Sequence, residues 1–157
     1  MKKVITTETI LAVWSILNTA SYKQLADEDK IRLWKIARHL KPVAKQFEED
    51  SKDAAEKMKS GYEGFDDGLM KAKQFEEMRK AGETDGLPMT EAEYQQFIRE
   101  VWNPYNSLVA KTAKEYADKE VEVDFEPLTE EAFGKLIASN DWTVDKVMTV
   151  GEILTNT

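Results

Sequence analysis

The sequence predicts a mainly α fold: a long bent antiparallel helical pair, additional short helices and a small two-stranded β ribbon. Two apolar stripes predict the helical pair, because steps of three and four residues place side chains on one side of a helix, as in a coiled coil. One strictly alternating segment predicts the ribbon. The stripes are Leu33, Ile36, Leu40, Val43, Phe47, Ala54 and Met58, and Tyr94, Phe97 or Ile98, Val101, Tyr105, Leu108, Thr112 and Tyr116.

The composition fits one helical domain over residues 1–157, with 41% hydrophobic residues available for a core. The chain has no cysteine, which excludes disulfides and thiolate metal sites. No run approaches the roughly 18 apolar residues of a membrane span. The first five residues begin like a signal peptide, but Glu8 follows early and no cleavage site is apparent. We therefore expect a mature protein in the cytoplasm, with association with a virion as the alternative.

The first two helices are predicted from their caps and apolar faces. Residues 7–19 form a helix capped by Thr6 or Thr7, and Asp27 caps a long helix that ends near Gly61. Pro42 falls inside this long helix, as Pro104 does in the later one, and each should bend its helix. If the two helices pair antiparallel, we expect the two bends to lie near each other.

The remaining elements follow from equally local signals. Residues 66–81 predict a shorter helix, and residues 82–88 predict a loop. The capping box of Thr90 and Glu93 predicts the start of a helix over residues 91–118. Residues 120–125 alternate as a strand, for which residues 21–25 are the expected partner. Thr129 caps a short helix. A last helix follows over residues 143–154, with these residues expected to be buried: Trp142, Val144, Val147, Met148, Ile153 and Leu154.

The formal net charge of −8 is concentrated in one segment. Residues 115–131 contain eight acids against Lys119 alone. The simplest interpretation is a solvated or internally paired surface. The alternative is an acidic inhibitor or nucleic-acid mimic that binds a basic partner through Glu120, Glu122 and Asp124. A basic stripe on the first long helix is read as a solvated face, so nucleic acid is not an expected partner; it comprises Arg38, Lys45, Lys52 and Lys59.

No residue is assigned to catalysis, a cofactor or a metal ion, and we do not expect an enzyme. The single histidine, His39, lacks the partners that a triad or a metal cluster needs. The paired carboxylates fall mostly at helix caps and on polar faces, and no phosphate-binding glycine motif is present. A carboxylate-based metal-dependent enzyme remains the alternative, and it predicts a thermal shift with Mg²⁺ or Mn²⁺.

The large aromatic residues fall mainly at stripe positions, where packing in the core is the default role. They are Trp14, Trp34, Trp102, Trp142, Tyr94 and Tyr105. Trp102 and Tyr105, beside Pro104, are candidates for a protein-binding surface, because aromatic residues dominate binding hot spots.

The order of these elements is similar to that of small, mostly helical proteins of unknown function encoded by tailed phages and prophages. The similarity is carried by Ile16-Leu17-Asn18, Asp27-Glu28-Asp29-Lys30, residues 40–49 and residues 121–128. It implies a phage-related binding or assembly protein and carries no catalytic residues. We therefore predict a non-catalytic protein–protein interaction module that assists phage or prophage assembly. The expected partner is a protein, with a second copy of the chain as one candidate and no membrane.

Overall fold

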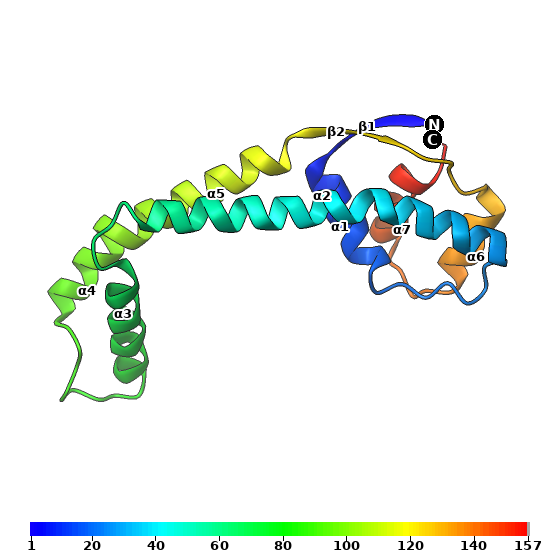
Figure 1. Cartoon of the computed structure of the whole chain (residues 1–157). Helices are drawn as coiled ribbons and strands as arrows, with labels where there is room; N and C mark the ends of the chain where they lie inside the picture. Colours follow the sequence, from blue (N-terminus) through cyan, green and yellow to red (C-terminus); the bar gives the residue numbers. More distant parts are fainter. Residues whose placement is uncertain (157) are drawn as a thin grey trace. The chain divides into compact units, whose positions relative to one another are not determined.

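The computed structural model describes residues 1–156 and is mainly helical, with one two-stranded antiparallel sheet (Figure 1). The predicted fold class is confirmed. The elements in chain order are β1 (Lys2–Thr6), α1 (Thr7–Leu17), α2 (Asp27–Lys59), α3 (Phe65–Lys80), α4 (Glu91–Phe97), the π-helix η1 (Ile98–Trp102), α5 (Asn103–Ala117), β2 (Glu120–Asp124), α6 (Glu130–Ala138) and α7 (Val144–Leu154).

Contacts along the chain gather in two compact units. The terminal unit comprises Met1–Glu49 and Glu115–Thr157, and the middle unit comprises Asp50–Lys114. Helices α2 and α5 each begin in one unit and end in the other. The expectation of a single domain stays a prediction. It holds if the two units unfold together.

The core of the terminal unit is built from both ends of the chain. Helix α2 contributes the first part of its apolar stripe, and α1, α6, α7 and the ribbon cover it. The side chains buried without measurable exposure are Ile10, Val13, Ile36, Leu40, Leu136, Val150, Ile153 and Leu154. Packing of an amphipathic face against such a core stabilises a helix more than its intrinsic propensity does.

The strand partner predicted for residues 120–125 is wrong. Strand β2 pairs antiparallel with β1, with Lys2 opposite Asp124 and Ile5 opposite Val121. Residues 21–25 form no strand, and the backbone of Ser21 is bonded instead to the side chain of Asn140. In this register Ile5 lies inward opposite Val121, while Lys2 lies on the outer side beside the acids of β2.

Lys3 lies on the inner side of β1 and closes the end of α7. Its Nζ donates hydrogen bonds to the backbone oxygens of Glu152 and Thr155, at 2.7 and 2.5 Å. Cations are favourable at this position because the last carbonyls of a helix lack partners within it. Burial lowers the pKa of Lys3, and the charge of Glu152 partly opposes that effect.

Part of the predicted burial in α7 is also wrong. Val144 and Met148 are 77% and 70% exposed, whereas Val150, Ile153 and Leu154 are buried. Thr143 is the N-cap of α7, so the helical spacing of side chains begins at Val144. Val144 and Met148 are four residues apart and lie on the side opposite the core.

The middle unit contains the end of α2, then α3, α4, η1 and most of α5. Within this unit, α2 and α5 run in opposite directions (Figure 1). They face each other across a small void of about 10 Å³, lined by Ser51, Ala54, Ala55, Met58, Val109, Thr112 and Ala113. The capping box is present as predicted, with Thr90 accepting from the Glu93 backbone N–H and the Glu93 carboxylate accepting from the Thr90 N–H.

The two prolines act differently from each other. Helix α2 continues through Pro42 without interruption. Pro104 lies two residues after the last residue of the π-helix, whose C-cap residue Asn103 donates its N–H to the Ile98 carbonyl. A π-helical turn accommodates a proline because the regular hydrogen-bond ladder is already interrupted there. The two prolines belong to different compact units, so the structure does not bring the expected bends together within one body.

The π-helix changes which residues of α5 face inward. Leu108, assigned to the apolar stripe, is 46% exposed, and Val109 lines the contact with α2 instead. A π-helical turn holds more residues than an α-helical turn, so it rotates every later position around the helix. Leu108 is therefore the stripe residue that departs from the predicted pattern, whereas Tyr105 is buried and Thr112 lines the contact with α2 as expected.

Arg79 and Glu91 hold the two ends of the loop over residues 82–88 together. The guanidinium Nη1 of Arg79 contacts both carboxylate oxygens of Glu91, at 2.9 and 2.7 Å. The hydrogen bond from Gln95 and then the one from Arg79 lower the pKa of Glu91 from 4.5. Any stability from this charge is present above about pH 4.5 and is lost as the pH falls through the lowered pKa.

Gly68 marks a close approach between α3 and α4. A Cβ built at this position would lie 2.8 Å from a ring carbon of Phe97, whereas one at Gly134 of α6 meets nothing within 4 Å. Replacing a helical glycine by alanine normally stabilises by about 0.5–1 kcal/mol. We therefore expect Gly134→Ala to stabilise by that amount and Gly68→Ala to be neutral or destabilising, as measured by equilibrium denaturation. An equal gain from both substitutions would contradict the close packing at Phe97.

Candidate functional site

The structure places the two groups of predicted binding residues in different units. Tyr105 is buried in the middle unit, with its ring centroid 4.5 Å from that of Phe65. Trp102 is half-buried, with its ring 5.9 Å from Tyr105. Trp102 is thus the more accessible of the two aromatic candidates, while Tyr105 packs in the core of its unit.

Glu120, Glu122 and Asp124 are exposed on the outer side of β2, in the terminal unit. Their charge is partly neutralised by the neighbouring strand, because Lys2 lies 3.4 Å from Glu122 and the N-terminal amine lies 3.1 Å from Asp124. Exposed ion pairs of this kind contribute little stability. The three acids therefore form an accessible surface whose net charge is smaller than the sequence suggests.

A surface that the sequence analysis did not single out lies on the first half of α2. Ile31 and Trp34 are 55% and 57% exposed, and Tyr22, in the preceding connection, is 52% exposed. The guanidinium carbon of Arg38 lies 4.7 Å from the centroid of the Trp34 ring, as in a cation–π contact. We call Ile31, Trp34 and Arg38 the α2 ridge.

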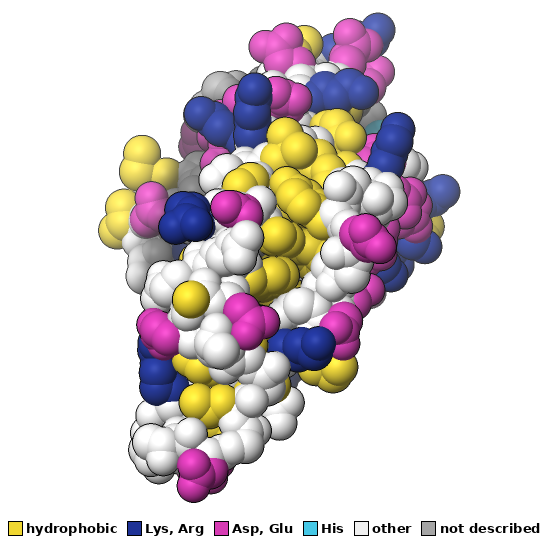
Figure 2. Space-filling model, turned by 90° about the vertical axis from the view of Figure 1, so that its left-hand side faces the viewer, with side chains coloured by type: hydrophobic (Ala, Val, Ile, Leu, Met, Phe, Trp, Pro, Cys, Tyr) yellow, Lys and Arg dark blue, Asp and Glu magenta, His cyan; other side chains and the backbone are white. Residues whose placement is uncertain are grey.

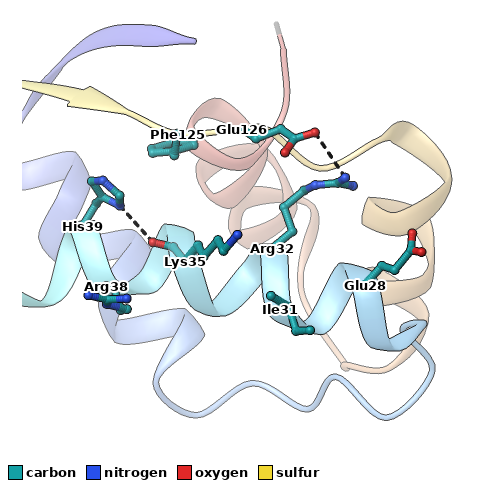
Figure 3. Close-up of a pocket in the computed structure, with 8 residues that line it drawn as sticks. All are labelled: Glu28, Ile31, Arg32, Lys35, Arg38, His39, Phe125 and Glu126. Atoms are coloured by element: carbon teal, nitrogen blue, oxygen red, sulfur yellow. Dashed lines mark hydrogen bonds and ion pairs between the residues drawn. The ribbon is translucent and has the colours of Figure 1, made fainter.

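A basic groove lies along one side of the ridge, with a volume of about 480 Å³. Its lining residues are Glu28, Ile31, Arg32, Lys35, Arg38, His39, Phe125 and Glu126 (Figure 3). Arg32 joins α2 to the segment after β2, because its guanidinium lies 3.2 Å from the carboxylate of Glu126. His39 donates through Nδ1 to the Lys35 carbonyl at 2.9 Å, and its ring lies beside that of Phe125.

An aromatic groove of about 320 Å³ lies along the other side of the ridge. Trp14, Tyr22 and Trp34 supply its aromatic walls, and Lys30 is its only ionisable cation. The remaining lining residues are Leu17, Asn18, Ala20, Leu33 and Ala37. Concave apolar surfaces with a few polar groups are typical of binding sites, and the exposed tryptophan would provide an anchor for a partner.

The electrostatics of this surface are opposite to those of the whole chain. Residues 30–47 contain six lysines and arginines and no acid, whereas the chain carries a net charge of −8. Arg32 is paired with Asp29 and Glu126. Within residues 30–47, four exposed cations make no ion pair: Lys35, Arg38, Lys41 and Lys45. Such a local positive field attracts acidic partners.

The spacing of residues along α2 already indicates this surface in the sequence. Leu33, Ile36 and Leu40 are buried, and Trp34 follows Leu33 by one residue, which is about 100° around a helix. Ile31, Trp34 and Arg38 are spaced by three and four residues, so they share a side of their own. Assigning Trp34 to the core by residue type was wrong because its phase does not match the apolar stripe.

The middle unit also exposes apolar surface. Among its described residues only Phe65, Ala72, Phe75 and Tyr105 are buried, and most other apolar side chains on its helices are half-buried. Figure 2 looks toward α3 and α4 and shows hydrophobic side chains gathered in a band between charged ones. This band carries no comparable excess of one charge, so it gives less information about the chemistry of a partner.

Residues 1–156 contain no cluster of three or more acidic or histidine side chains arranged to hold a metal ion. None of the helices they form has the length and apolar character needed to cross a membrane. The structure thus shows a mainly α protein with a basic and aromatic surface on α2. Comparisons with protein families, with curated proteins and with solved structures found no match for this chain.

Proposed function

We propose that the chain is a non-catalytic protein–protein interaction module that binds an acidic, partly apolar protein segment through the α2 ridge and its two grooves. The exposure of Trp34 carries this proposal. A tryptophan that is 57% exposed beside a groove is costly to leave in water, and a partner that covers it gains a large apolar contact.

The charges around the ridge support an acidic partner. The unpaired cations Lys35, Arg38 and Lys41 lie on the same exposed side of α2 as Trp34. A protein segment with acids beside apolar side chains satisfies both features of the surface. Nucleic acid fits less well, because one face of the indole is already covered by Arg38 and the net charge of the chain is negative.

On the resemblance alone, we extend the proposal to phage or prophage assembly. An assembly protein needs a stable scaffold that presents a docking surface. The terminal unit provides both, with a buried core on one side of α2 and the ridge on the other.

Capture from native lysate tests the proposal. The wild-type chain is expected to retain a specific protein at low salt, with less retained at high salt because the cations of α2 are screened. Trp34→Ala is expected to lose that protein. Met70→Ala is the matched control, because Met70 is also exposed but lies in the middle unit. Equal retention by all three chains would exclude the α2 ridge as the binding surface.

The acidic surface of β2 is the second candidate, favoured by the exposure of Glu120, Glu122 and Asp124. It would make the chain an acidic inhibitor or nucleic-acid mimic for a basic partner. Replacing the three acids with glutamine or asparagine is then expected to abolish salt-sensitive capture of a basic protein, with Trp34→Ala leaving that capture unchanged. The opposite pattern would support the α2 ridge instead.

A further inference from the structure

A second acidic and apolar surface lies on α7, on the terminal unit that also carries the α2 ridge. Val144 and Met148 are among the most exposed large apolar side chains of the described chain. Asp145 lies next to them on the helix, and Asp141 precedes it; both acids are exposed. An apolar pair flanked by acids is the chemistry that the α2 ridge is suited to bind. We call Val144, Asp145 and Met148 the α7 face.

We propose that the partner of the α2 ridge is a second copy of this chain, which docks its α7 face there. This inference rests on the proposed function, since it names the occupant of the same site. Met148 and Val144 would cover Trp34 and Ile31, while Asp145 and Asp141 would approach Lys35 and Arg38. Both faces are exposed within one copy, so neither already covers the other.

The geometry of this contact determines the kind of assembly. The ridge and the α7 face are different surfaces, so the contact between two copies is heterologous. A pair of copies joined by one such contact still has one free ridge and one free α7 face. Such contacts form rings where the rotation closes and open chains where it does not. Association should weaken with added salt, because exposed charge pairs are screened.

Two variants, each with one face removed, separate this contact from any other self-association. The ridge variant carries Trp34→Ala and Arg38→Ala and keeps its α7 face. The α7 variant carries Met148→Lys, which places a cation against the cations of the ridge and keeps its own ridge intact. All three side chains are exposed, so both variants are expected to fold, which far-ultraviolet circular dichroism and thermal unfolding would verify.

Sedimentation velocity over a wide range of protein concentration gives the test. The wild-type chain is expected to associate as its concentration rises, and each variant alone to associate at least about tenfold more weakly. An equimolar mixture of the two variants is expected to form a one-to-one dimer and to stop there, because only one compatible pair of faces remains.

Three outcomes would overturn the inference: a wild-type chain that stays monomeric throughout, variants that associate as well as the wild type, or a mixture that stays monomeric. None of them decides the proposed function. A lysate protein that is retained by the wild type and lost with Trp34→Ala would leave the binding role of the ridge standing with a different partner. Failure of both experiments would remove the ridge as a binding site.

Discussion

Replacing Ile36 with alanine is expected to destabilise the terminal unit by about 2–5 kcal/mol. Ile36 has no measurable exposure and packs in the core with residues from both ends of the chain. Removing its branched side chain loses the transfer free energy of the deleted carbons and leaves a cavity that the ribbon and helices cannot fully close. Equilibrium unfolding in urea, followed by circular dichroism, measures the loss.

Ile31→Ala is the matched control for this prediction. Ile31 is the same residue type in the same helix and the same unit, but it is exposed on the ridge. We expect its replacement to change the free energy of unfolding by less than about 1 kcal/mol. Comparable losses of stability from both substitutions would contradict the placement of Ile36 in the core and Ile31 on the exposed side of α2.

Replacing Trp34 with alanine is expected to weaken binding of the partner about 30-fold or more, which corresponds to roughly 2 kcal/mol. The indole is the largest exposed apolar side chain of the ridge, and it borders the aromatic groove. Its loss should cost the folded chain little, because the side chain is 57% exposed and its cation–π contact with Arg38 is worth about 0.5–1 kcal/mol at an exposed site.

Calorimetric titration of the purified partner into the wild-type and variant chains would measure this effect. Trp102→Ala is the informative comparison, because it removes the half-buried tryptophan of the middle unit. A large loss with Trp102→Ala and none with Trp34→Ala would move the binding site to the aromatic surface that the sequence first indicated.

Elements defined by local sequence signals could be predicted. The capping box of Thr90 and Glu93, the caps at Thr6 and Thr129 and the alternation of residues 120–124 all appear where the sequence indicates them. Each of these depends on hydrogen bonds or periodicity within a few residues. The fold class follows from them, because most of the chain carries helical signals.

Features that depend on distant residues could not be predicted in the same way. The partner of β2 lies more than 100 residues away in β1, and no local sequence signal links the two strands. The π-helix before Pro104 shifts the phase of α5, which exposes Leu108 against the heptad pattern. The exposure of Val144 and Met148 depends on which side of α7 meets the core.

The candidate site was missed for a different reason. Residue type predicts a core position for Trp34, but its position on α2 is out of phase with Leu33 and Ile36. The sequence analysis interprets a different set of cations, Arg38, Lys45, Lys52 and Lys59, as a solvated face and does not single out the run over residues 30–47. Only the structure brings that run together with Tyr22 and the two grooves.

Hydroxyl-radical footprinting of the chain, free and bound to its captured partner, tests the central claim most directly. Exposed indole rings react readily, so mass spectrometry can follow Trp34 and Trp102 in the same sample. We predict strong protection of Trp34 in the complex and unchanged modification of Trp102. Equal modification of Trp34 in the free and bound chains would contradict a partner that binds the α2 ridge.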